Sequence, residues 1–237
     1  MRAGYHTYSL MSKNASVLKL HQHYCQDSKT KTKGGYERLL QVTKHGCTFF
    51  EPSNKENNKM WIGEDDERPK IARRSRTVRR VMYALFFDSD GIVARVPVPE
   101  HTSVTGTFYK NNVLSEVVRH YTAKRPRTGL RGVKLLHDNA PAHRSAVVTE
   151  YLQENNIETL PHPPYSPDLS PCDFWLNPHI KGYLRGRRFE TRSAVGSALY
   201  QCTNSIPKEM FQKAFCDWLM RLEKCVKMGG EYFEGFH

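Results

Sequence analysis

Apolar residues gather in short blocks from position 39 onward, and their spacing distinguishes strands from helices. The block Leu39–Phe50 predicts a strand that is interrupted around Lys44–Gly46. Two further apolar runs, Val81–Phe87 and Ile92–Val98, flank the turn sequence Asp88-Ser89-Asp90-Gly91. Because this tetrapeptide suits a tight turn, the two runs are predicted to form a β-hairpin.

Strand and helix patterns alternate in the middle of the chain. The helical spacing of valine and leucine residues predicts a helix over Phe108–Tyr121. Short apolar runs predict strands at Val133–Leu136 and Ile157–Leu160. Between these two strands an apolar stripe predicts a second helix, with Pro141 as its first residue, a position that proline favours.

The last third of the chain is predicted to be helical. A helix is expected to start near Ser170, after a proline-rich segment, and the helical pattern runs to about Lys227 with a break at Ile206-Pro207. The chain therefore has strands first, then alternating strands and helices, then helices. This order predicts an α/β fold in which helices cover both faces of a mixed sheet.

The elements form one domain, predicted to span residues 39–237. Residues 1–38 are poorly defined and contain a polar, basic stretch at Ser28–Gly35 that is expected to be a loop. Residues 51–80 are polar and charged and form an insertion between the first two strands. An irregular segment of this length is uncommon inside a compact domain unless it has a function or is disordered.

The chain carries 36 Lys and Arg against 24 Asp and Glu, a formal charge of +12, which suits a polyanionic partner such as DNA. A solvated basic surface is the alternative interpretation, both for the whole chain and for any single basic run. We expect DNA contacts from three runs, whose basic residues are Arg73, Arg74, Arg76, Arg79, Arg80, Lys124, Arg125, Arg127, Lys181, Arg185, Arg187 and Arg188.

Several classes of protein are disfavoured by the same composition. No apolar run approaches the length of a membrane span, and the N-terminal residues lack the apolar stretch of a secretory signal. The six cysteines contain no CxxC pair, so neither a zinc site nor a disulfide framework is indicated. A reduced intracellular compartment fits this cysteine usage best.

Two aspartates stand where functional acids are often found. Asp138 follows a predicted buried strand, at the sheet edge where α/β proteins bind ligands. Taken alone, it is better explained as a cap of the following helix. Asp173 lies in Ser170-Pro171-Cys172-Asp173, which taken alone is an ordinary helix opening with serine as N-cap and proline at the first helical position.

The sequences around these two aspartates favour a functional role over the structural explanations. Residues 137–143 read HDNAPAH, residues 162–174 read HPPYSPDLSPCDF, and 34 residues separate Asp138 from Asp173. Both strings and their interval closely resemble the mariner family of cut-and-paste DNA transposases, which includes a member fused to a histone methyltransferase. The strands around VMYALFFDSDGIV (81–93) and the helical tail from Ile206 to Phe236 resemble the family too, so the similarity covers roughly residues 39–236.

The resemblance implies a ribonuclease-H-like fold, with three antiparallel strands followed by parallel strands, in which three aspartates hold two divalent metals, Mg²⁺ or Mn²⁺. Asp138 and Asp173 match the second and third of these metal ligands. Clustered carboxylates suit Mg²⁺ because it prefers oxygen ligands and shares its shell with phosphate oxygens. The resemblance further implies DNA transposition in the nucleus, transposon ends as partners, and a homodimer held in part by the segment 51–80.

The first predicted strand differs from the family's pattern. The family carries its first aspartate in a string similar to V-T-G-D-E-T-W, whereas here Val42-Thr43 is followed by Lys44-His45-Gly46-Cys47-Thr48, and no acid occurs from Arg38 to Phe50. His45 is the nearest possible substitute, but imidazole suits zinc better than magnesium. We therefore expect impaired strand cleavage. A DNA-binding or dimerising remnant without catalysis and a non-functional relic are the alternatives.

The N-terminal part also departs from the family. Mariner transposases carry two helix-turn-helix modules that recognise transposon ends, and the roughly forty residues before the first strand are too few for both. No helix-turn-helix pattern is evident there. Sequence-specific recognition of transposon ends is therefore not expected from these residues.

Overall fold

The computed structural model describes residues 39–48, 80–100 and 102–228. Of residues 43–48 and 80 it describes only the backbone. The predicted N-terminal segment 1–38 and nearly all of the predicted insertion 51–80 lie outside these ranges, so both remain predictions.

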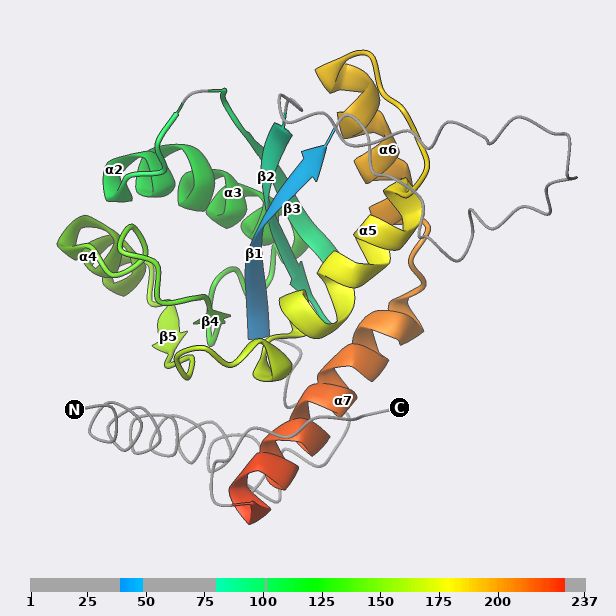
Figure 1. Ribbon diagram of the computed structural model, residues 1–237. Coiled ribbons are helices and arrows are strands. Elements are labelled where there is room, and N and C mark those ends of the chain that lie inside the picture. Colours follow the sequence, from blue (N-terminus) through cyan, green and yellow to red (C-terminus); the bar gives the residue numbers. More distant parts are fainter. Residues whose placement is uncertain (1–38, 49–79, 101, 229–237) are drawn as a thin grey trace, which may run out of the picture.

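A five-stranded mixed sheet forms the centre of the fold, in the order β3-β2-β1-β4-β5 (Figure 1). The first three strands pair antiparallel, and β4 and β5 continue the sheet in parallel with β1. This confirms the predicted architecture of three antiparallel strands followed by parallel ones. The strands are β1 (Leu39–Thr48), β2 (Arg80–Asp88), β3 (Gly91–Val98), β4 (Lys134–Leu136) and β5 (Glu158–Leu160).

Strand β1 is continuous, so the predicted interruption around Lys44–Gly46 is wrong. The backbone of these residues pairs with β2 without a break, Lys44 opposite Ala84 and Gly46 opposite Met82. The hydrogen bonds of an antiparallel ladder are made by the backbone alone, so polar side chains and a glycine do not end the strand when a long partner lies beside it.

The β2–β3 hairpin has the predicted turn. Gly91 adopts a φ of 126°, which a residue with a side chain rarely reaches, and the backbone N–H of Asp90 donates to Oδ1 of Asp88 at 2.9 Å. Asp88 and Ser89 are buried. The turn therefore lies within the fold and not at a free surface.

Helices cover both faces of the sheet, as predicted. One face is covered by α2 (Gly106–Phe108), the π-helical segment η3 (Tyr109–Leu114), α3 (Ser115–Lys124) and α4 (Ala146–Glu154); the other by η4 (Pro167–Leu169), η5 (Cys172–Leu176), α5 (Asn177–Leu184), α6 (Arg192–Asn204) and α7 (Lys208–Lys227) (Figure 1). None of the described helices is long and apolar enough to cross a bilayer.

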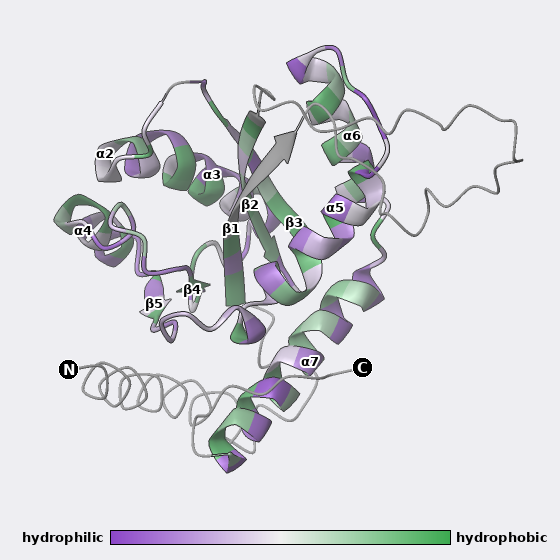
Figure 2. Ribbon diagram, in the orientation of Figure 1, coloured by the Kyte–Doolittle hydropathy of each residue, from purple (hydrophilic) through white to green (hydrophobic). Residues whose placement is uncertain are grey.

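The side chains of alternate residues of β1, the central strand, pack into two separate hydrophobic cores. Leu40 and Val42 pack with Tyr109 and the helices of the first face, whereas Leu39 packs with Trp218 and the helices of the second. Strand β2 is accordingly mostly hydrophobic (Figure 2), whereas β5, at the edge of the sheet, exposes Glu158 and Thr159. Both faces of β1 are therefore buried over residues 39–42, at the centre of the sheet.

The helix after β4 begins later than predicted. Pro141 lies in a turn, and α4 starts at Ala146 after Ser145, whose φ and ψ are extended. The intervening residues fold back toward the end of β4, where His143 Nδ1 contacts Asp138. The loop that makes this contact occupies residues 138–143, so the helix begins only after it and not at Pro141.

Candidate active site

Asp138 lies two residues beyond the end of β4, at the carboxyl edge of the parallel part of the sheet. Its Oδ1 accepts a hydrogen bond from the backbone N–H of Ala140 at 3.1 Å and lies 2.7 Å from Nδ1 of His143. The Asp138 side chain is 65% exposed. It is therefore an accessible acid whose orientation is determined by two donors of its own loop.

Asp173 comes from the other face of the sheet, in the first turn of η5. Its backbone N–H donates to the carbonyl of Ser170, as the predicted helix opening requires, and its Oδ1 accepts from Nδ2 of Asn177 at 3.2 Å. The preceding η4 is anchored to α7, because Trp218 Nε1 donates to the Leu169 carbonyl at 2.9 Å. The C-terminal helix thus helps to position the segment that carries Asp173.

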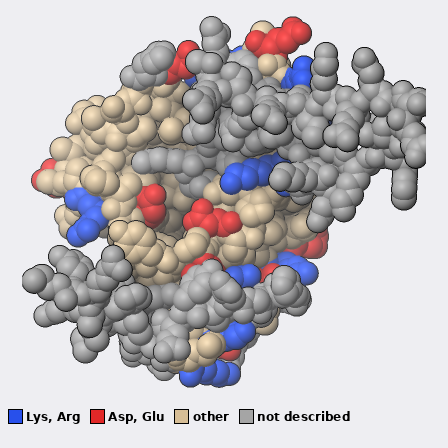
Figure 3. Space-filling view, in the orientation of Figure 1, with Lys and Arg blue, Asp and Glu red and all other residues tan. Residues whose placement is uncertain are grey.

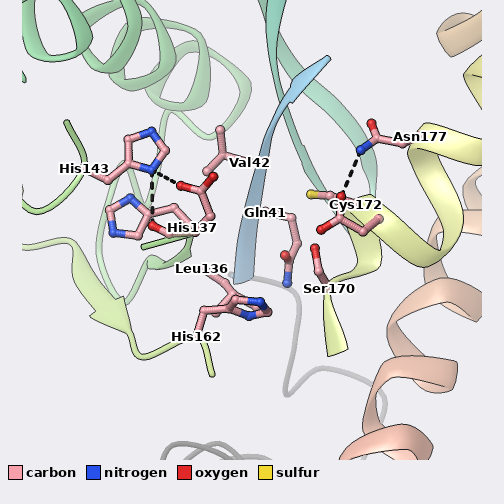
Figure 4. A pocket seen from close by; sticks show the side chains of 11 residues that line it. Gln41, Val42, Leu136, His137, His143, His162, Ser170, Cys172 and Asn177 are labelled. Carbon is pink, nitrogen blue, oxygen red and sulfur yellow. Dashed lines mark hydrogen bonds and ion pairs between the residues drawn. The ribbon is translucent and has the colours of Figure 1, made fainter. Parts of the chain in front are cut away.

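Both aspartates line one cavity of about 140 Å³ beside Gln41 and Val42 of β1, next to the carboxyl end of β4. The structure thus brings the two acids to the same sheet edge. His137 and His143 lie on one side of β1, and Cys172 and Asn177 lie on the other (Figure 4).

Gln41 projects from β1 between these two groups and lines the same cavity (Figure 4). It is paired with Leu136 across the β1–β4 ladder and is 1% exposed. Its Nε2 atom has no hydrogen-bond partner in the described part of the chain. Sequence reasoning missed this residue, although a single polar side chain in the apolar run of β1 is the signal that could have revealed it.

The cavity contains donors that suit a hard divalent cation, but few of them carry charge. Asp138, Asp173 and the carboxamides of Gln41 and Asn177 offer oxygen atoms, which Mg²⁺ and Mn²⁺ favour. Among the residues that the structure describes, no group of three or more His, Cys, Asp or Glu side chains is placed to hold a metal. Two carboxylates and two carboxamides are therefore the oxygen donors that the lining of this cavity offers to a divalent cation.

Cys172 also lines the cavity but is not a suitable nucleophile. Burial, and then the charge of Asp173, raise the pKa of its thiol well above the usual value of 9.0. The thiol consequently stays protonated at neutral pH, and only the thiolate is strongly nucleophilic. Cys172 is 2% exposed and packs as part of the core.

An open groove of about 680 Å³ adjoins the cavity and shares Asp138, His162 and Asp173 with it. Its remaining walls include Arg144 and a proline-rich loop with the 95% exposed Tyr165. In the space-filling view, acidic side chains gather near the middle of this face, with basic side chains around them (Figure 3). The two aspartates are thus reachable from a groove wide enough for an extended ligand.

The predicted basic residues have different surroundings. Lys124 and Arg125 form ion pairs with the fully buried carboxylate of Asp88, at 3.1 and 3.4 Å, so both have a structural role inside the protein. Exposed positions are occupied by Arg127, Lys181, Arg185, Arg187 and Arg188. The side chains of Arg73, Arg74, Arg76, Arg79 and Arg80 lie outside the described residues. DNA contact stays a prediction for all of them.

Known proteins are similar to this domain in sequence. The sequence profile of the DDE superfamily endonucleases matches residues 49–195, more than half of the chain. The chain is 28% identical over 209 residues to the mariner Mos1 transposase of Drosophila mauritiana, and 24% identical over 181 residues to the histone-lysine N-methyltransferase SETMAR of Homo sapiens. These alignments cover 87% and 76% of the chain but only 59% and 26% of the two relatives.

Solved structures share its fold as well. A Mos1 transposase paired-end complex with the left transposon end matches with a TM-score of 0.83 and 26% identity, covering 96% of this chain and 64% of that one. The catalytic domain of Mos1 mariner transposase matches with a TM-score of 0.75 and 24% identity, covering 96% of each chain. The predicted ribonuclease-H-like fold and the resemblance to mariner transposases are thereby confirmed, and the chain belongs to the DDE superfamily of endonucleases.

Proposed function

We propose that this chain is a mariner-type transposase catalytic domain that binds DNA and cleaves and joins its strands with Mg²⁺ or Mn²⁺ held by Asp138 and Asp173. The observation that carries the proposal is that both aspartates line one cavity beside an open groove. Mos1 structures that match this chain include complexes with transposon ends and with Mg or Mn. Transposon ends are accordingly the DNA that we propose as partner, in the nucleus and with the chain as a homodimer.

The residues of the site have separable tasks in this reaction. Asp138 and Asp173 present carboxylate oxygens from opposite sides of β1. The close contact of Asp138 with Nδ1 of His143 and the hydrogen bond of Asp173 with Asn177 restrain those oxygens. A divalent cation bound there would lower the pKa of an attacking water or 3′-hydroxyl and neutralise charge on the phosphate and the leaving oxygen. Arg144 on the groove wall is suited to a backbone phosphate.

We propose that the reaction is slow in this chain because β1 lacks the family's acid. When Val42-Thr43 is aligned with the family's motif, His45 occupies the position of that acid. The backbone of His45 pairs with Tyr83 inside β1, so the position is part of a regular strand and not of a displaced loop. With two carboxylates in place of three, the site has less negative charge with which to bind two divalent cations.

The test is metal-dependent cleavage of a nicked or terminal-repeat duplex by the wild-type chain, His45→Asp and Asp138→Ala. We expect slow product formation with Mn²⁺ from the wild type, faster formation from His45→Asp, and none from Asp138→Ala. A wild type and a His45→Asp variant that are both no more active than Asp138→Ala would contradict the proposal. Thermal melts of all three proteins control for folding.

A DNA-binding domain without catalysis is the second candidate, and the missing acid of β1 favours it. This function requires the basic surface but not the carboxylates. In the same experiment it would appear as DNA binding that is equal in the wild type and in Asp138→Ala, with no metal-dependent product from the wild type or from His45→Asp. The basic residues exposed near the end of α5 would then be its functional residues.

A further inference from the structure

His143 is a buried base that contacts the accessible acid of the site. The His143 side chain is 2% exposed, and its Nδ1 lies 2.7 Å from Oδ1 of Asp138. The backbone N–H of Ala140 donates to the same oxygen at 3.1 Å. Nδ1 of His143 also lies 3.3 Å from the backbone carbonyl oxygen of Asp138, so both the main chain and the side chain of Asp138 contact this nitrogen. Together with Ala140, His143 therefore restrains the Asp138 carboxylate.

The surroundings of His143 also determine which ring nitrogen carries the proton. Nε2 is buried and has no hydrogen-bond partner among the described residues. A proton on Nε2 would therefore leave a buried N–H unsatisfied, whereas a proton on Nδ1 is donated to Asp138. A proton on Nδ1 thus has acceptors in Asp138, whereas a proton on Nε2 has none among the described residues.

Two aromatic rings hold the His143 ring in this orientation. The ring of His137 stacks on it with centroids 4.8 Å apart and planes 1° apart. The ring of Tyr109, fully buried in η3, packs against it at 4.3 Å. These two contacts hold the plane of the ring. Within that plane, the oxygens of Asp138 favour the side on which Nδ1 lies.

We infer that His143 is a positioning residue, which orients the carboxylate of Asp138 for a divalent cation through its Nδ1–H. The inference rests on the proposed function, in which Asp138 binds that cation. It predicts that metal affinity depends on a donor attached to Cγ of residue 143. A purely structural histidine would require only a side chain that fills the space.

Two amide substitutions separate these roles. In His143→Asn the amide nitrogen is bonded to Cγ, as Nδ1 is, so a donor can reach Asp138. In His143→Gln the amide nitrogen is one bond further out, at the position of Nε2. Both variants are polar and smaller than or similar to histidine, and their thermal midpoints show whether they fold.

The measurement is Mn²⁺ binding to the full chain, followed by the electron paramagnetic resonance signal of free Mn²⁺. We expect His143→Gln to weaken Mn²⁺ binding about tenfold or more, and His143→Asn to recover most of that loss. Asp138→Asn, the reference for loss of the ligand itself, should abolish the binding seen in the wild type. Equal affinities of the wild type and both folded variants, or an equal loss in both, would overturn the positioning role.

Failure of the proposed function gives a different result. If the wild type and Asp138→Asn bind Mn²⁺ equally well, or if neither binds it, both the metal site and the positioning role are overturned. If the histidine variants do not fold, ¹⁵N NMR of the wild-type His143 ring tests the inference directly. A proton on Nδ1 is expected, and a proton on Nε2 alone would overturn the inference.

Discussion

Tyr109 combines two properties that are costly for a phenol: complete burial and a hydroxyl group without a hydrogen-bond partner in the described part of the chain. Its ring supports His143 and belongs to the core beneath β1. Burial, and secondarily the charge of Asp138, raise the pKa of Tyr109 above its usual value of 10.0. The ring is thus useful to the site, whereas the hydroxyl opposes folding.

We predict that Tyr109→Phe stabilises the protein by about 1 kcal/mol at pH 7, because it removes a buried and unsatisfied hydroxyl group. The gain should increase above pH 10. There the tyrosine of the unfolded state ionises first, since the folded-state pKa is the higher one, and the wild type loses stability that the variant keeps. Urea unfolding at pH 7 and pH 11 measures both effects. A variant less stable than the wild type at pH 7 would contradict the assignment.

At the scale of elements, ion pairs connect the β2–β3 turn to the helices α3 and α7. The buried Asp88 pairs with Lys124 and Arg125 at the end of α3, and Asp90 pairs with Arg125 at 3.1 Å and with Lys208 at the start of α7 at 2.7 Å. Although partial burial acts against it, the hydrogen bond and charge of Lys208 and the charges of Lys124 and Arg125 lower the pKa of Asp90. The hairpin is therefore fixed against both helix layers.

We predict that Asp88→Asn destabilises the fold by about 2 kcal/mol. This is less than the loss of a fully buried ion pair, because the side chains of Lys124 and Arg125 are 33% and 17% exposed. Glu116→Gln is the matched control, since it removes a carboxylate from the exposed pair with Arg119, and it should leave the thermal midpoint unchanged. Equal midpoints for both variants would refute a structural role of the turn.

At the scale of the whole molecule, a chain with a formal charge of +12 carries two aspartates at its candidate site. Lys181 on α5 and Arg185 just beyond it are exposed, and α5 begins at Asn177, which contacts Asp173. A helix that starts at the candidate site and ends in basic residues suits the proposed DNA partner, because those residues are placed to contact backbone phosphates. Binding of this kind releases counterions and depends steeply on salt.

We predict that the double variant Lys181→Ala/Arg185→Ala binds duplex DNA more weakly and with a smaller salt dependence. Each lost phosphate contact reduces the slope of log affinity against log salt by about 0.9, so a change of about 2 is expected. Arg119→Ala/Lys213→Ala removes the same charge from exposed positions on α3 and α7 and is the control. Fluorescence anisotropy at several salt concentrations measures both slopes. Equal slopes for both variants would mean that net charge alone drives binding.

Much of this fold was predictable because its signals are local. The hairpin turn at Asp88–Gly91, the short strand before Asp138 and the helix opening at Ser170 each depend on a few adjacent residues, and each was predicted where the structure has it. The motifs around Asp138 and Asp173 also identified the family without any coordinates. The sequence by itself thus determined the order of elements, the likeness to mariner transposases and the absence of an acid on β1.

Only the tertiary structure decided how distant residues meet. It made β1 continuous through Lys44–Gly46 by giving it a long partner strand, and it placed Lys124 and Arg125 on Asp88, which precedes them by 36 and 37 residues. It also brought Gln41 into the cavity. Such contacts depend on which surfaces pack together across the whole chain, and residue spacing along the sequence carries no direct record of that packing.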